Sequence, residues 1–283
     1  MSSQSKQTFL NLNRLWKNYS KEIIATVVFL LAYMPTFFWM WDRWFVRDSY
    51  YSHGILVPFV TIYLIWQMKD ELAKIERSES PWGMRFIVVG IVLYLISSML
   101  RIYFSSAISM MIVLVGLILY FFGSAVLSKI AFPIAFLFFM IPLPMVVIAN
   151  ISFKLKLFAA QIATILLNHM RIPAIREGSV IKMMDAQVVV DDVCSGLRSL
   201  ISLTALGSIF AFWMKGSRVK KCLLFFSTIP IAVITNVCRI LLLAFISEIW
   251  GSQYARGFVH DFSGFMVFGL AFVLLFSVGK LLE

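Results

Sequence analysis

Three side chains with complementary chemistry lie in the last third of this 283-residue chain: Cys194, Arg239 and His260. A thiol can act as a nucleophile, an imidazole as a general acid and base, and a guanidinium as a stabiliser of a developing oxyanion. Each lies within or beside an apolar run, where polar groups are costly and therefore mark functional sites. Brought together by the fold, the three would supply a nucleophile, a general acid and base, and an oxyanion stabiliser at one site.

Cys194 opens an apolar run, with Ser195 next to it and Arg198 one helical turn further. An ordinary thiol has a pKa of about 8.5, so roughly 3% of it is thiolate at pH 7. A helix N-terminus and a cation on the same helix face both favour the thiolate, whereas the preceding Asp191 and Asp192 oppose it. The alternative is a small buried hydrophobic residue, and the spacing alone leaves both interpretations open.

Arg239 lies inside its apolar run, roughly 12 Å from the outer end at a rise of 1.5 Å per residue. A guanidinium at such a depth costs on the order of 2.5–3.5 kcal/mol on insertion scales. A water-filled cleft, a substrate oxygen or an acidic partner must offset that cost. A structural ion pair with an aspartate or with Glu248 is therefore the alternative to an oxyanion role. Asn236, three residues earlier on the same face, could also donate to a substrate oxygen.

The histidines are weaker signals taken one at a time. His260 alone could be a helix cap or an interface residue, and it gains weight from lying on the same side of the membrane as Cys194. His53 could line a substrate entrance or end a loop, and we count it with Ser195 as a supporting residue. The three histidines have no zinc-type spacing and the three cysteines no disulfide framework. We therefore expect no metal and no cofactor, and expect the other two cysteines to be packing residues.

Composition restricts the fold class. Hydrophobic residues make up 61% of the chain and charged residues 14%, against roughly 45–50% and about 25% in soluble domains. The mean hydropathy is +0.90. A soluble, disordered or disulfide-stapled protein is excluded, and continuous rather than alternating apolar runs disfavour a β-barrel. The net charge of +11 comes from short segments between these runs, so we expect no nucleic-acid binding. The sequence predicts an all-α polytopic membrane protein.

A helix needs about 20 apolar residues to cross the hydrocarbon core, and eight runs are candidates for such spans. The second and third are short, and we expect Pro142 and Pro144 to kink the fifth or end it early. The runs are 23–41, 55–68, 86–100, 103–122, 130–151, 195–214, 222–246 and 262–278.

The basic residues predict the orientation of these eight helices. One set of connecting segments holds fourteen Lys and Arg, and the opposite short loops hold four. By the positive-inside rule the first set, with both termini, is cytoplasmic, and Cys194 and His260 lie outside. We expect one integral-membrane domain with a cytoplasmic tail 1–22, an extracytoplasmic segment 152–193 and catalytic helices 194–283. Within its outer part, 151–170 is amphipathic and suits the interface, and 178–190 alternates like a small hairpin before the sixth helix.

The motifs together resemble the exosortase/archaeosortase family of multi-pass membrane transpeptidases, and the resemblance covers most of the chain. It implies that Cys194, Arg239 and His260 form the catalytic triad. The matching pieces are Cys194-Ser195-Gly196-Leu197-Arg198-Ser199-Leu200, then Asn236-x-x-Arg239-Ile240, then His260-x-x-x-Gly264, with Gly178-Ser179-Val180-Ile181 and Tyr51-Ser52-His53-Gly54-x-Leu56-Val57-Pro58 earlier in the chain.

The resemblance also implies a substrate class. Clients of the family are exported proteins with a C-terminal sorting tail, made of a short motif that often begins Pro-Glu-Pro, one transmembrane helix and a basic cluster. The expected protein is a cysteine peptidase or transpeptidase of the bacterial inner membrane that cleaves this tail and transfers the client to an acceptor. Two other classes of protein remain as alternatives. One is a non-catalytic polysaccharide-export or transport subunit, in which Arg198 and Arg239 bind an anionic substrate. The other is a lipid-linked glycosyl- or acyltransferase, although the acidic residues expected outside the membrane form no metal-binding motif.

Overall fold

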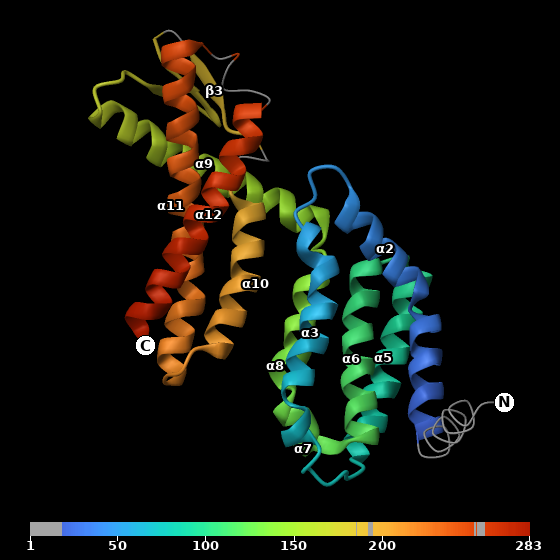
Figure 1. The fold of residues 1–283 in the computed structure, drawn as a ribbon. Helices are drawn as coiled ribbons and strands as arrows, with labels where there is room; N and C mark the ends of the chain where they lie inside the picture. Colours follow the sequence, from blue (N-terminus) through green and yellow to red (C-terminus); the bar gives the residue numbers. More distant parts are fainter. Residues whose placement is uncertain (1–18, 185, 192–194, 252, 254–257) are drawn as a thin grey trace, which may run out of the picture. The chain divides into compact units, whose positions relative to one another are not determined.

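The computed structural model describes residues 19–184, 186–191, 195–251, 253 and 258–283, and it is an all-α polytopic membrane protein with one small sheet (Figure 1). Five of the described helices are long and apolar enough to cross a membrane, or up to seven if each of two bent pairs forms one span. Two more apolar helices, Ser52–Gln67 and Leu197–Trp213, are shorter. The expected number of eight spans stays a prediction. Helices suit this setting because lipid offers the backbone no hydrogen-bond partners.

The chain divides into two compact units, Met1–Arg43 with Ile55–Ile141 and Trp44–Gly54 with Pro142–Glu283. The second unit therefore takes a short segment from the first third of the sequence. The boundaries expected at 22, 152 and 194 stay predictions.

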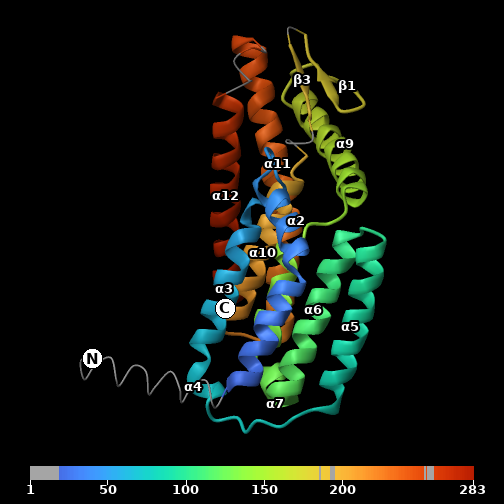
Figure 2. The ribbon, with the colours of Figure 1, turned by 90° about the vertical axis from the view of Figure 1, so that its right-hand side faces the viewer.

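The regular elements of the first unit are all helical. Its α5 and α6 form an antiparallel pair (Figure 2), and small residues let their backbones approach closely. A Cβ on Gly116, for example, would lie 2.8 Å from the backbone nitrogen of Ile87. Its elements are the helix Tyr19–Ala32, α2 (Met34–Phe45, which runs into the second unit), α3 (Leu56–Gln67), α4 (Lys69–Leu72), α5 (Pro81–Met99), α6 (Tyr103–Phe121), α7 (Gly123–Lys129), α8 (Ala131–Phe136) and the 3₁₀ turn η2 (Leu137–Met140).

Two helix pairs of this unit are sharply bent. The helix Tyr19–Ala32 meets α2 at 58°, and α7 meets the segment Ala131–Met140 at 66°. Pro35 lies in the first turn of α2, where its ring and missing N–H prevent the two helices from continuing as one. The bend brings polar side chains of the first unit into contact with each other, as described below.

The second unit is built on three helices, α10 (Leu197–Trp213), α11 (Arg218–Trp250) and α12 (Phe258–Leu282), which α9 (Met145–His169) crosses obliquely (Figure 1). Strands β1 (Ile175–Glu177), β2 (Val180–Lys182) and β3 (Gln187–Val189) form an antiparallel sheet in that order. Strands β2 and β3 lie within residues 178–190, where polar and apolar residues alternate in the sequence. Strand β1 is a further strand that the sequence analysis did not include.

One apolar cluster joins the sheet, α9 and α11. Ile181 of the sheet is fully buried in it, and α9 contributes a stripe of small residues that allows α11 to come close. The buried members are Ala159, Ala160, Ala163, Leu167, Ala174, Ile181, Val188, Val190, Val237, Ile240, Leu243 and Ala244. This cluster fixes the part of α11 that carries Asn236 and Arg239.

At the prolines the structure confirms the second of the two expected outcomes, an early end of the run 130–151. The segment ends with η2 at Met140, and α9 starts at Met145 directly after Pro144. The amphipathic stretch 151–170 is thus the later part of a 25-residue helix. Cys222 and Cys238, which the sequence analysis expected to be packing residues, are instead exposed on α11.

Candidate functional site

The first motif of the site surrounds the start of α10. Gly196 precedes the helix with a left-handed backbone, φ 80°, and its carbonyl accepts the first helical hydrogen bond, from Leu200 at 2.9 Å. A Cβ at Gly196 would lie 2.9 Å from Cγ and 3.0 Å from Cβ of Asn236. Glycine is required here for two reasons, the backbone conformation and the close approach of α11. Ser195, 3% exposed, places its Oγ 3.3 Å from the backbone N–H of Leu197.

Replacing Gly196 with alanine tests this contact. The new methyl group meets the side chain of Asn236, so we expect Gly196→Ala to lower the free energy of unfolding by about 1–3 kcal/mol more than a left-handed backbone alone explains. Gly178→Ala is the matched control, because Gly178 has φ 63° and open space around it. Thermal unfolding of the purified proteins in detergent measures the difference, and equal losses for both variants would contradict the contact.

The second motif is a buried arginine between α11 and α12. Arg239 is 8% exposed, and its Nε donates to Oγ of Ser263 at 2.9 Å. On the next residue, a Cβ on Gly264 would lie 3.6 Å from Nη2 of Arg239. The guanidinium therefore lies flat against α12 beside a residue without a side chain. The Ser263 hydroxyl thus fixes the orientation of the guanidinium through its Nε.

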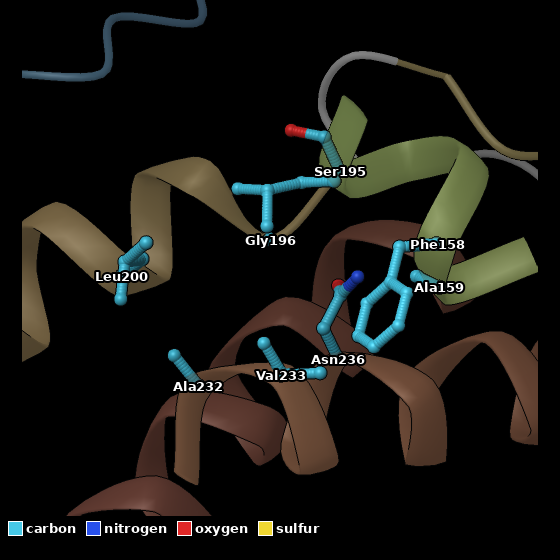
Figure 3. A pocket seen from close by; sticks show the side chains of 9 residues that line it. Phe158, Ala159, Ser195, Gly196, Leu200, Ala232, Val233 and Asn236 are labelled. Atoms are coloured by element: carbon cyan, nitrogen blue, oxygen red, sulfur yellow. The ribbon is translucent and has the colours of Figure 1, made fainter. Parts of the chain in front are cut away.

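Asn236 connects the two motifs. It is 3% exposed, lies three residues before Arg239 on α11, and contacts Gly196 of α10. Figure 3 shows its amide directed toward the Ser195–Gly196 turn. The three motifs found in the sequence, at the starts of α10 and α12 and within α11, thus form one chain of contacts.

A mostly apolar pocket lies beneath this turn, where α9, α10 and α11 meet (Figure 3). Its cavity volume is about 10 Å³, roughly the space of one water molecule, and Asn236 and Ser195 are its polar lining residues. The lining residues are Leu155, Phe158, Ala159, Ser195, Gly196, Leu200, Ala232, Val233 and Asn236. The contribution of α9 was not foreseen from the sequence, where its small residues were the available signal.

The Trp44–Gly54 segment covers one face of α10 close to this turn. Arg198 Nη2 lies 3.4 Å from Oδ1 of Asp48, and one turn further Ser202 Oγ lies 3.2 Å from Nδ1 of His53. The ring of His53 also stacks on Tyr51, with the centroids 6.0 Å apart. Burial raises the pKa of the Tyr51 hydroxyl above its ordinary value, so it stays protonated at neutral pH. Arg198 was expected to face Cys194, and among the described residues its ion-pair partner is Asp48.

The family model described as "Transmembrane exosortase (Exosortase_EpsH)" matches residues 23–277. The chain belongs to the transmembrane exosortase family. Neither the curated proteins nor the solved structures that were compared with the chain give a match.

In this exosortase the three motifs converge, but two residues of the expected triad are not described at side-chain level. Cys194 lies outside the described residues, directly before Ser195. The backbone of position 260 belongs to α12, one turn before Ser263 and Gly264 and on the same helix face, and the side chain of His260 lies outside the described part. The roles of Cys194, Arg239 and His260 therefore remain predictions.

Sequence reasoning missed Ser263, Ser202 and Asp48 as partners of exosortase site residues. Each is a common polar residue without a motif of its own, and only the packing of helices brings it into contact. As for metal ligands, the described residues contain no group of three or more His, Cys, Asp or Glu side chains that could hold an ion.

Proposed function

We propose that this exosortase is a membrane cysteine peptidase and transpeptidase. It cleaves the C-terminal sorting tail from an exported protein and transfers the trimmed protein to an acceptor. The observation that carries the proposal is the chain of contacts from Gly196 through Asn236 and Arg239 to Ser263. It supports a common site for the thiol that precedes Ser195 and the imidazole one turn before Ser263. A guanidinium that is 8% exposed and held in position by a hydroxyl suits a site where negative charge develops.

The proposed mechanism has two halves. The Cys194 thiolate attacks the carbonyl carbon of the scissile peptide, and the guanidinium of Arg239 stabilises the resulting oxyanion. His260 gives a proton to the leaving nitrogen, the C–N bond breaks, and the tail departs as an amine. An acceptor amine, hydroxyl or water then attacks the thioester with His260 as base, and the thiolate leaves. The reaction needs neither a metal nor an oxidant.

The supporting residues have separate roles in this proposal. Asn236 donates from its amide to a substrate oxygen and holds the Ser195–Gly196 turn, while Ser195 fixes the turn through its contact with the Leu197 N–H. Arg198 and His53 anchor the Trp44–Gly54 segment on α10, beside the path a substrate would take.

Charge supports an outward-facing site. The turn between α10 and α11 carries Lys215, Arg218, Lys220 and Lys221, at the end of α10 opposite to Ser195. The positive-inside rule makes that turn cytoplasmic and the Ser195 end extracytoplasmic. The proposed location is the bacterial inner membrane, with both termini in the cytoplasm, and a tail motif that emerges just outside the membrane would meet the thiol there.

Trapping the covalent intermediate tests the function. The exposed thiols Cys222 and Cys238 are first replaced by alanine, so that Cys194 is the single thiol left. This protein is incubated with a reporter that carries a Pro-Glu-Pro tail, a transmembrane helix and a basic cluster, and the reaction is quenched with acid. We expect intact-mass spectrometry to show enzyme plus reporter without its tail, and hydroxylamine to release the adduct. Tail release without any adduct at Cys194 would contradict the thioester.

A further inference from the structure

A polar pocket lies in the first unit, beside the bend between the helix Tyr19–Ala32 and α2. Its cavity volume is about 80 Å³, and every residue that lines it except Pro35 is polar: serines, a threonine, tyrosines and one arginine. It belongs to α2, α5, α6 and the turn between the last two, so it is separate from the candidate site of the second unit. Polar pockets in an apolar helical unit are costly and indicate a ligand or a function.

Two buried hydroxyl groups in this pocket leave one donor unused. Thr36 Oγ1 and Ser106 Oγ lie 2.6 Å apart, and they are 1% and 4% exposed. A hydrogen bond between two hydroxyls uses one of their two O–H groups, and the described residues offer no acceptor for the other. By contrast, the adjacent Ser109 donates to the Ser106 carbonyl at 2.7 Å and lies 3.0 Å from the hydroxyl of Tyr33. The pocket therefore lacks an acceptor beside Thr36 and Ser106.

A cation borders the same pocket. Arg101 lines it from the turn between α5 and α6, with a left-handed backbone of φ 55°. Within the described part of the chain, its guanidinium has neither a hydrogen bond nor an ion pair. The hydroxyl of Ser98 is likewise unused among those residues, and it also lines the pocket. A guanidinium together with several O–H donors is the combination that binds the oxygens of a phosphate group.

The pocket edge is apolar and exposed. Met99 and Leu100, next to Arg101, are 85% and 63% exposed, so acyl chains can lie along α5 beside the polar lining. We propose that this pocket binds a phosphate group, carried by a membrane phospholipid headgroup or by a small phosphate ester. The ligand's oxygen accepts the free hydrogen of the Thr36–Ser106 pair, and Arg101 neutralises its charge. This proposal is independent of the cysteine chemistry.

The experiment uses the full chain purified in maltoside detergent, with binding measured by native mass spectrometry. The probes are phosphatidylglycerol, a diacylglycerol with the same acyl chains, and inorganic phosphate. We expect phosphatidylglycerol to bind and diacylglycerol to bind at least about tenfold more weakly, because it lacks the charged acceptor. Binding of inorganic phosphate with the same dependence on the pocket residues would also support the site, with a small phosphate ester as its ligand.

Matched variants decide whether the pocket is responsible. Arg101→Gln and Thr36→Val are each expected to weaken binding about tenfold or more. Arg47→Gln removes the same charge outside the pocket, and Ser128→Ala removes a hydroxyl from α7, so both should bind as the unmodified chain does. Arg101 is exposed, so its replacement keeps the test valid even if Thr36→Val fails to fold. Equal binding of diacylglycerol, no binding of either phosphate probe, or equal effects of pocket and control variants would overturn the proposal.

Discussion

Cys194→Ala is expected to abolish processing and leave the full-length client in the membrane. The methyl side chain cannot attack the scissile carbonyl, and loss of a covalent nucleophile typically costs about 10⁴-fold or more in rate. Because the turn around Gly196 is kept, the variant should fold and still bind its client. The ratio of full-length to cleaved reporter, measured by immunoblot at equal enzyme levels, gives the loss.

The chain supplies its own controls for this experiment. Cys222→Ala and Cys238→Ala change the two exposed thiols of α11, and both should process the reporter at the unmodified rate. A Cys194→Ala protein that still cleaves at that rate would remove the thiol from the mechanism, and a similar loss in all three variants would point to damage of the fold.

Arg239→Gln carries the second largest expected effect. Removing one oxyanion donor typically lowers kcat about 10²–10³-fold, and glutamine keeps much of the side-chain volume without the charge. Since the interaction forms chiefly in the transition state, KM should change little. Single-turnover cleavage of the reporter measures the chemical step, and thermal unfolding of the same samples measures how much protein is folded.

Ser263→Ala tests the orientation of Arg239 without changing its charge. It removes the hydroxyl that accepts from Nε of Arg239 and keeps the guanidinium, so we expect the cleavage rate to fall about tenfold, which corresponds to one ordinary hydrogen bond. Arg239→Lys keeps the charge without the planar fork, and its cleavage rate should lie between those of Ser263→Ala and Arg239→Gln. If cleavage per folded molecule is normal in Arg239→Gln, the arginine has a structural role only.

The helical membrane fold could be predicted because an apolar run of membrane length has few alternatives. The motif residues could be identified because polar residues are rare within apolar runs. Arg239, for example, interrupts such a run. The contact between Gly196 and Asn236 could not be predicted, since it depends on how closely α10 approaches α11. Nor could the partner of Arg198, because the sequence offered several acidic residues at the expected outer level and no rule that selects Asp48.

The break at residues 141–144 shows a second limit. Two prolines in an apolar run indicate an interruption, but a kink within one helix and the end of that helix leave the same local pattern. Only the packing of α9 against the sheet and α11, through small residues such as Ala160 and Ala163, decides that a new helix starts at Met145. The bounds of α9 could therefore not be obtained from hydropathy alone.

The Trp44–Gly54 segment has a consequence for how the protein is made. Its partners Arg198 and Ser202 are translated about 150 residues later. At a synthesis rate of roughly 5–20 residues per second, Arg198 and Ser202 are synthesised on the order of 10–30 s after the segment that they contact. During that interval a newly inserted N-terminal half is incomplete, and the insertion machinery or a chaperone must shield it. Maturation of α10 is thus coupled to the persistence of a segment that was synthesised long before it.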